Sequence, residues 1–164
     1  MDYPNITISA TPHVRSKQST QTIMRDVIIA LVPAAAMGVI KFGVNALILM
    51  AVSVITAVVA EAAYQKITKQ KVTVSDLSAV VTGILLAMNI PSSAPIWVPV
   101  VGSAFAIIFA KQLFGGLGQN FINPALAGRA FLLGSYPTIM TSWVTPGADA
   151  VSTATPLGLL KAGT

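Results

Sequence analysis

The feature that most constrains this chain is an uncharged apolar run of nineteen residues, Phe42 to Ala60. As an α-helix this run would span about 28 Å, close to the ~30 Å hydrocarbon core of a bilayer. Other apolar runs flank it, and only 9% of all residues are charged. Soluble domains carry about 25% charged residues. The chain is therefore expected to be a polytopic helical membrane protein.

Apolar runs and breaks along the sequence predict an all-α bundle of five transmembrane helices, several interrupted by Pro or Gly. The five runs are 27–40, 42–60, 77–90, 96–114 and 124–144. This pattern divides the chain into an N-terminal arm at 1–22, a membrane domain at 23–144 and a tail at 145–164. We expect the arm to be cytoplasmic and the tail extracytoplasmic.

The ends of the predicted helices carry capping signals. Asp26 is expected near the start of the first helix, where the helix dipole favours an anion, and Pro33 is expected to kink that helix. The following loop is expected to run from Glu61 to Asp76. Side chains that can cap are Ser19 or Thr20 for the first helix, Thr73 or Ser75 for the third, and Asn123, followed by Pro124, for the fifth.

The third apolar run ends at a proline-rich break. Residues 77–90 would span only about 21 Å as a helix, too short to cross a membrane unaided. Pro91, Pro95 and Pro99 follow, around Ser92 and Ser93. Irregular backbone at membrane depth must be buried by protein or line a cavity. We therefore expect 91–95 to be non-helical and shielded from lipid.

The distribution of Lys and Arg predicts the orientation. With the N-terminus in the cytoplasm, eight of these residues lie inside and two, Lys41 and Lys161, lie outside. The positive-inside rule favours this arrangement. The eight inside residues are Arg15, Lys17, Arg25, Lys66, Lys69, Lys71, Lys111 and Arg129.

The chain lacks the residue types that several kinds of cofactor site require. The chain has no Cys and one His, so it cannot by itself hold an iron–sulfur cluster on thiolates, a bis-His haem or a Cys/His zinc ion. His13 is expected to be a surface or interface residue, and no metal site is expected. No basic run is interleaved with aromatics, so nucleic acid is not an expected partner. An electron carrier of this composition needs a bound organic cofactor.

A small, polar, turn-prone tail follows the last apolar run. Its pattern, Asp149-x-x-Ser152-x-Ala154-Thr155-Pro156-Leu157, resembles the flavin-attachment motif of one membrane protein family. This family contains the D subunit of the Rnf-type ferredoxin:NAD oxidoreductase and the B subunit of the sodium-pumping NADH:quinone oxidoreductase. The resemblance implies that Thr155 carries FMN through a phosphoester bond. Asp149, Ser152 and Ala154 would then form the motif that a separate flavin transferase recognises. An ordinary Ser/Thr-rich loop is the alternative.

Three further stretches resemble the same family in the same order. They are Thr11-Pro12-His13-Val14-Arg15-Ser16, with Thr where the family has Ser; the first helix from Arg25 to Ala34; and Phe114 to Arg129, with its glycine turn. Family members carry a second set of helices after the flavin site. The resemblance therefore covers the N-terminal half of the family pattern and implies one half of a two-fold repeat.

The resemblance implies a multi-pass flavoprotein subunit of the inner (cytoplasmic) membrane. Such a subunit carries electrons on FMN between an extracytoplasmic flavin partner and carriers in the membrane, coupled to Na⁺ or H⁺ translocation. It is a translocase subunit and is not catalytic alone. The expected partners are the other subunits of the complex, the flavin transferase and membrane lipid. A second, non-covalent flavin is left open.

Other interpretations of single features remain open. The tripeptide Asn123-Pro124-Ala125 also occurs at half-helix ends in channels, so half of a channel or transporter without cofactor is the alternative function; a purely structural scaffold is a third. Arg129 can be a snorkelling or packing charge, or a contact to a cofactor phosphate or partner. Gly115, Gly116 and Gly118 are expected to serve a turn or close packing. Asn45, Asn89 and Gln112 are expected to form interhelical hydrogen bonds. Asp26 and Glu61 are the only acids at helix ends that could join a cation pathway, and neither is expected within the membrane.

Overall fold

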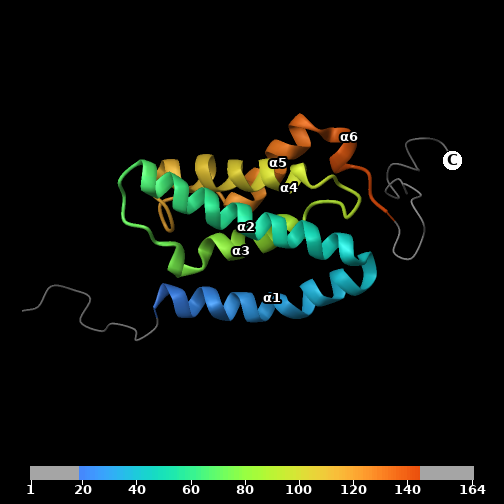
Figure 1. Ribbon diagram of the computed structural model, residues 1–164, viewed down its shortest axis with the longest axis horizontal. Helices are drawn as coiled ribbons and strands as arrows, with labels where there is room; N and C mark the ends of the chain where they lie inside the picture. Colours follow the sequence, from blue (N-terminus) through green and yellow to red (C-terminus); the bar gives the residue numbers. More distant parts are fainter. Residues whose placement is uncertain (1–18, 145–164) are drawn as a thin grey trace, which may run out of the picture.

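The computed structural model describes residues 19–144, which form α- and other helices joined by short loops. Five helical segments run alternately between two ends of the molecule (Figure 1). We call the end formed by 68–76 and 115–123 the glycine-turn end, and the end formed by 88–96 and 136–144 the tail end. The segments are α1 (Thr20–Phe42), α2 (Val44–Ile67), α3 (Ser78–Ala87), α4 (Trp97–Phe105) with η2 (Ala106–Lys111) and η3 (Gln112–Phe114), and α5 (Pro124–Ser135).

The protein is an all-helical, polytopic membrane protein. Three helices of the described part are long and apolar enough to cross a membrane: α1, α2 and the continuous stretch Trp97–Phe114. The third apolar helix, α3, has ten residues. The expected helical membrane bundle is confirmed at this level, whereas the count of five membrane crossings stays a prediction.

The first helix begins where its cap was predicted and continues through Pro33. The side chain of Ser19 accepts a hydrogen bond from the backbone N–H of Thr22 at 3.2 Å. The prediction for Asp26 is wrong, because the first turn of α1 holds no acidic residue. Asp26 instead lies next to Arg25 on the exposed surface, 3.4 Å from its guanidinium.

The second helix is longer than its uncharged core predicts. It continues through Glu61 to Ile67, so Glu61 does not begin a loop. The long apolar run before it propagates the helix, and Ala62 and Ala63 favour its continuation. Glu61 is fully buried within α2. This position corrects the expectation that it lies at a helix end.

The third helix is capped differently from the prediction. Leu77 precedes it in a left-handed conformation (φ 65°), and neither Thr73 nor Ser75 caps it. Instead, the carboxylate of Asp76 accepts the backbone N–H of Ser78 at 2.8 Å. Asp76 itself lies in the short 3-10 helix η1 (Val74–Asp76).

The predicted break between the third and fourth helices is confirmed. Residues 88–96 contain no α-helix. Pro91 is buried, whereas Ser93 and Pro95 are exposed. The expected shielding is therefore only partial within the described part of the chain.

The fifth helix begins as predicted and ends early. Asn123 accepts the backbone N–H of Ala125 at 2.9 Å, with Pro124 at the first helical position. This capping role explains the Asn-Pro-Ala sequence without a pore. The helix ends at Ser135, and the short α6 (Pro137–Met140) follows. The predicted continuation to Val144 is therefore wrong.

Small residues bring three helices together at mid-bundle. A Cβ atom on Gly83 of α3 would lie 2.7 Å from the Cα of Val54 in α2. The buried hydroxyl of Ser53 bonds the carbonyl of Gly83 and the hydroxyl of Ser103, each at 2.8 Å. These contacts fix α2, α3 and α4 in close register, while α1 has no buried residue.

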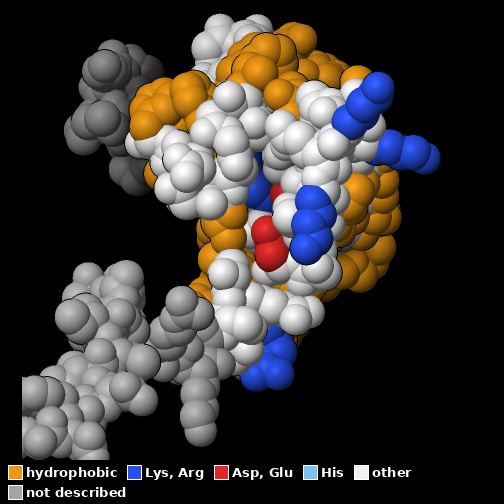
Figure 2. Space-filling view, turned by 90° about the vertical axis from the view of Figure 1, so that its left-hand side faces the viewer, with side chains coloured by type: hydrophobic (Ala, Val, Ile, Leu, Met, Phe, Trp, Pro, Cys, Tyr) orange, Lys and Arg blue, Asp and Glu red, His pale blue; other side chains and the backbone are white. Residues whose placement is uncertain are grey.

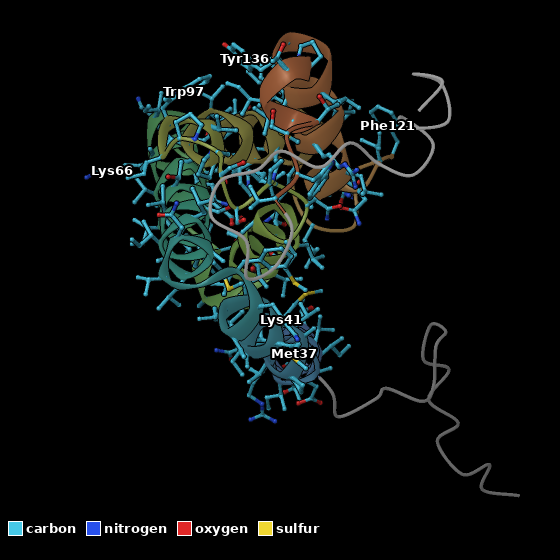
Figure 3. All side chains as sticks on the ribbon, turned by 90° about the vertical axis from the view of Figure 1, so that its right-hand side faces the viewer. Met37, Lys41, Lys66, Trp97, Phe121 and Tyr136 are labelled. Carbon is cyan, nitrogen blue, oxygen red and sulfur yellow. The ribbon has the colours of Figure 1, made fainter. Side chains whose placement is uncertain are left out.

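The tail end contains an aromatic pair and the C-terminal part of α1. Trp97 and Tyr136 form an edge-to-face contact with ring centroids 4.9 Å apart. Figure 3 shows this pair on the main bundle and Met37 and Lys41 on α1, away from it. Trp and Tyr are enriched where membrane proteins meet the membrane–water interface.

Candidate functional site

The predicted flavin-attachment residues lie outside the described residues. These are Asp149, Ser152, Ala154 and Thr155, together with the neighbouring hydroxyl of Thr153; His13 of the arm also lies outside. Their predicted roles therefore stay predictions. The described part of the chain contributes two other features, one at each end of the bundle.

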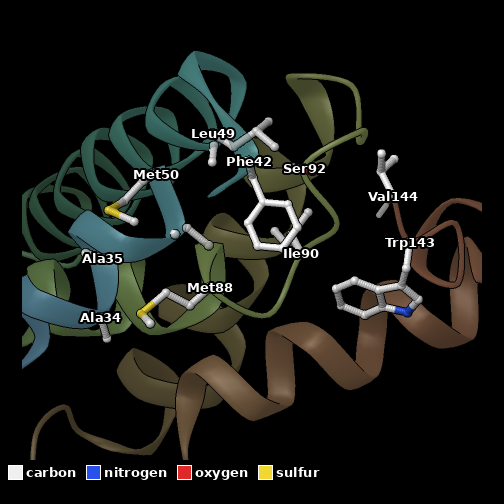
Figure 4. Close-up of a pocket in the computed structure, with 13 residues that line it drawn as sticks. Ala34, Ala35, Phe42, Leu49, Met50, Met88, Ile90, Ser92, Trp143 and Val144 are labelled. Carbon is white, nitrogen blue, oxygen red and sulfur yellow. The ribbon is translucent and has the colours of Figure 1, made fainter. Parts of the chain in front are cut away.

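An apolar cavity of about 280 Å³ lies at the tail end, where α1, α2 and α3 meet the segment that leads to the tail. Phe42 and Trp143 line it from two sides, and Met50, Met88 and Ser92 also contribute (Figure 4). Ligand pockets usually have about 300–1,000 Å³. This cavity has the size and lining for one flat aromatic ring system rather than a whole nucleotide.

A charged pair is buried on the other side of the molecule, toward the glycine-turn end. The Nζ atom of Lys111 lies 2.7 Å from Oε1 of Glu61, and the two side chains are 2% and 0% exposed. The pair joins α2 to the end of η2. An ion pair withdrawn from water is maintained only with further hydrogen bonds.

These further bonds come from two glutamines and are one-sided. Gln112 donates to Oε1 of Glu61 at 2.8 Å, and Gln65 donates to the same oxygen at 3.4 Å. With Lys111, three donors converge on Oε1. The other oxygen, Oε2, is buried and has no hydrogen-bond partner among the described residues. Such an atom calls for a physical explanation, because a buried acceptor without a partner is destabilising.

The chain after α4 departs from regular α-helical geometry where Lys111 and Gln112 approach Glu61. Residues 106–111 form a π-helix and residues 112–114 a 3-10 helix. Consecutive side chains of a regular α-helix point about 100° apart. Here the consecutive residues Lys111 and Gln112 both reach one carboxylate. π-Helical turns are frequent at functional sites.

A second carboxylate is connected to the pair through Ser78. Lys111 donates to Oγ of Ser78 at 2.6 Å, and this hydroxyl donates to Asp76 at 2.5 Å. Ser78 is buried and Asp76 half-buried. We define the buried polar cluster as Glu61, Gln65, Asp76, Ser78, Lys111 and Gln112.

The buried polar cluster borders a polar cavity of about 680 Å³ at the glycine-turn end. Gln65, Asp76 and Gln112 line this cavity and thus separate Glu61 from it. Figure 2 shows this end hollowed, with acidic and basic side chains inside the hollow. The cavity gives the cluster a polar route to the surface.

The match to a known protein family shows to which family this chain belongs. The profile of the NQR2, RnfD, RnfE family matches residues 7–164 of this chain. The chain belongs to this family.

Relatives within the NQR2, RnfD, RnfE family support the assignment over nearly the whole chain. The D subunit of the Na⁺-translocating ferredoxin:NAD⁺ oxidoreductase complex of Acetobacterium woodii is 59% identical over 99% of this chain and 52% of its own length. The D subunit of the proton-translocating complex of Clostridium ljungdahlii is 48% identical, over 94% of this chain and 48% of its own length. The D subunit of the ion-translocating oxidoreductase complex of Shewanella denitrificans is 43% identical, over 94% and 45%. The chain spans about half the length of the curated relatives it matches.

Three polar residues of this family member form hydrogen bonds that connect different segments of the bundle. Asn45 donates to the carbonyl of Ser92 at 3.3 Å, and Gln112 donates to Glu61. Asn89 accepts a hydrogen bond from Arg129 at 2.6 Å. This bond supports the packing interpretation of Arg129. The interhelical hydrogen bond expected for Gln112 is confirmed, whereas the bonds of Asn45 and Asn89 connect a helix with the non-helical segment 88–96.

The glycine turn also has the predicted character. Gly115, Gly116 and Gly118 have φ values of 105°, 92° and 85°, which favour glycine. A Cβ atom would meet nothing within 4 Å at Gly116 or Gly118. These two glycines therefore serve turn geometry and not close packing.

The buried polar cluster is the part of this site that the sequence analysis missed. The charge count places Lys111 on the cytoplasmic side, but its side chain is buried in η2. A signal was present: Glu61 and Gln65 are four residues apart and share a helix face, directly after an apolar run. Lys111 and Gln112 likewise end an apolar run, and charges in such positions are seldom left unpaired.

Proposed function

We propose that this chain is part of a D-type subunit of an ion-translocating ferredoxin:NAD oxidoreductase complex of the Rnf kind, with FMN attached covalently to Thr155. The main supporting observation is that the family match covers residues 7–164, and that the alignment with a 59% identical Rnf-type relative covers 99% of the chain. Both therefore include the tail. The complex catalyses the overall reaction, and this chain is one contributor to it. Other subunits and a flavin transferase are its proposed partners.

The proposed orientation places the N-terminus in the cytoplasm and Thr155 on the extracytoplasmic side. Two charges used for this prediction, Lys111 and Arg129, bond to Glu61 and Asn89 of other segments inside the bundle and are left out of the count. Removing them from the eight leaves six Lys and Arg inside against Lys41 and Lys161 outside. The positive-inside rule still favours this orientation. The exposed pair Trp97 and Tyr136 at the tail end is consistent with a membrane interface there.

The described residues fit the proposed cofactor. FMN, when bound, supplies one- and two-electron transfer, and the protein fixes its position and environment. The cavity beside Phe42 and Trp143 adjoins Val144, the last described residue before the tail. Aromatic and thioether side chains suit a flat ring, and Ser92 offers a polar group at the edge. These side chains would hold the ring and exclude water from it.

Attachment of the flavin requires an external enzyme in this proposal. A threonine hydroxyl attacks phosphorus only when a base or a metal activates it. Asp149 is the one acidic residue in the tail, and the described residues contain no group of three or more His, Cys, Asp or Glu able to hold a metal. Asp149, Ser152 and Ala154 therefore serve recognition in this proposal, not catalysis.

In-gel flavin fluorescence tests the proposal. Protein produced together with a flavin transferase should fluoresce after denaturing electrophoresis, because a covalent phosphoester survives denaturation. A non-fluorescent band, with water or solute permeability in stopped-flow measurements on proteoliposomes, would favour the channel alternative instead. A non-fluorescent, impermeable protein would favour a scaffold.

A further inference from the structure

We propose that the polar cavity at the glycine-turn end is the docking site of the chain's own segment 11–18, with Arg15 as the counter-ion of Asp76. The cavity has about 680 Å³ and borders the buried polar cluster. A docked segment would close the polar route between this cluster and the surface. The inference goes beyond the proposed function and does not depend on flavin attachment.

The first step is the place where the segment is attached. Residues 11–18 lead directly into Ser19, and Ser19, Thr20 and Gln21 line the cavity. Helix α1 also contacts η1, the 3-10 helix that contains Asp76. A segment tethered at the wall of a cavity has an effective concentration in the millimolar range. It therefore docks at a lower entropic cost than a separate ligand.

The second step is the state of Asp76, a half-buried carboxylate that lines the cavity. Its two hydrogen bonds, from the backbone N–H and the hydroxyl of Ser78, both use Oδ1. Among residues 19–144, Oδ2 accepts no hydrogen bond and Asp76 forms no ion pair. A charge withdrawn from water is usually paired. This carboxylate therefore lacks a cation on the side that faces the cavity.

Two described cations lie on the same side of the molecule, and neither pairs with Asp76. Lys111 reaches it only through the hydroxyl of Ser78 and is paired with Glu61. Lys71 lines the cavity, but its side chain is exposed and forms no ion pair with Asp76. The missing cation is therefore expected from outside residues 19–144.

The third step is the chemistry of the segment. Residues 11–18 contain Arg15 and Lys17 and no acidic residue. Arg15 is four residues before Ser19, and four extended residues span at most about 14 Å. Arg15 can therefore enter the cavity from its wall while α1 stays in place. A guanidinium also matches a carboxylate with two parallel hydrogen bonds, which an ammonium cannot form.

The fourth step is the rest of the lining. Gln70 and Ser75 line the cavity, and their side chains form no hydrogen bond with other described residues. They can bond the hydroxyl and amide groups of Thr11, Ser16 and Gln18. Such a polar lining does not suit an acyl chain. Docking also gives the stretch from Thr11 to Ser16 a role, which the proposed function leaves open.

Cysteine cross-linking tests the docking directly, because the chain has no cysteine of its own. The full chain in lipid nanodiscs carries Val14→Cys, next to Arg15, and Ser75→Cys in the cavity lining. The matched control combines Val14→Cys with Lys69→Cys, an exposed position in the same connection between α2 and α3 but outside the lining. A mild oxidant forms the disulfide, and a polyethylene-glycol maleimide added after denaturation counts the remaining thiols.

The pair at Val14 and Ser75 should cross-link about tenfold faster than the control pair, because docking raises its effective concentration. Arg15→Gln or Asp76→Asn should slow this reaction about fivefold, as expected when one partly exposed ion pair is lost. Arg15→Lys, which keeps the charge without the planar fork, should fall between. Asn at position 76 keeps an oxygen that can accept the N–H of Ser78, so the start of α3 is preserved.

A single cysteine gives an independent measurement. Ser75→Cys should react faster with a water-soluble maleimide when Arg15→Gln is added, whereas Lys69→Cys should keep its rate. Equal cross-linking of the two pairs, or rates that Arg15→Gln leaves unchanged, would overturn the proposal. Shielding of Ser75→Cys that is abolished only by removing lipid would assign the cavity to a lipid headgroup and would also overturn it. These readouts do not involve flavin, so their failure leaves the proposed FMN attachment untouched.

Discussion

Lys111 donates a 2.7 Å hydrogen bond to Glu61, a residue fifty positions earlier in the chain, and the two side chains are almost completely buried. This single contact joins α2 to the π-helical end of the fourth apolar segment. From the sequence, Glu61 is expected at the start of a loop and Lys111 on the cytoplasmic side. In the structure the two side chains form one buried pair. The stability of the bundle depends on it.

The pair should show strong energetic coupling. Glu61→Gln or Lys111→Met alone should lower the free energy of unfolding by about 3–5 kcal/mol, because each leaves the other charge buried without its partner. The double variant Glu61→Gln/Lys111→Met should be more stable than either single variant. Thermal or denaturant unfolding in detergent, in choline chloride, measures the three variants as a double-mutant cycle. Additive losses would show that the two charges do not interact.

The close approach of α2 and α3 predicts a sharp difference between two glycines. Gly83→Ala should destabilise the protein by about 1–3 kcal/mol, because the new methyl group would overlap the backbone of Val54. Gly38→Ala, inside α1 with nothing within 4 Å, should be neutral or stabilising by up to about 1 kcal/mol. Unfolding temperatures of the two variants check this. Equal effects would argue against the packing at Gly83.

The orientation can be tested by single cysteines, because the chain has none of its own. Thr145→Cys should react with an impermeant thiol reagent added to intact cells. Gln70→Cys, in the exposed loop after α2, should react only after lysis. The positive-inside count is the physical basis. The reverse labelling pattern would invert the proposed topology.

Local signals predicted much of the fold. Long apolar runs predicted the helices, and Ser19 and Asn123 predicted where two of them start. The prolines after residue 90 predicted the break between the third and fourth helices. Each of these depends on neighbours in sequence, where the physical rules are strongest. The same holds for the turn at Gly116 and Gly118.

Contacts between distant residues could not be predicted in this way. Glu61 follows an uncharged run and is expected to begin a loop, but it lies within α2, and residues 111 and 112 from the fourth segment bury its side chain. Its partner Lys111 is found only when the fourth segment is folded back against α2. The start of α3 is a similar case: neither Thr73 nor Ser75 caps it, and Asp76 accepts the backbone N–H of Ser78 because a 3-10 turn that the sequence did not indicate orients its side chain.

The central claim is that Thr155 carries FMN. An esterified phosphate on this residue would be a diester with about one negative charge, and Thr153 and Ser152 are the competing hydroxyls nearby. Thr155→Ala should abolish covalent flavin, whereas the matched Thr153→Ala should retain it. Thr155→Ser should retain some, because a primary hydroxyl can form the same ester.

The most direct measurement is peptide mass spectrometry of protein produced together with its flavin transferase. Our account predicts that the fragment containing residues 152–155 carries the mass of FMN minus water, with fragment ions that place it on Thr155. An unmodified Thr155 under these conditions, or a flavin located on Thr153, would contradict the account.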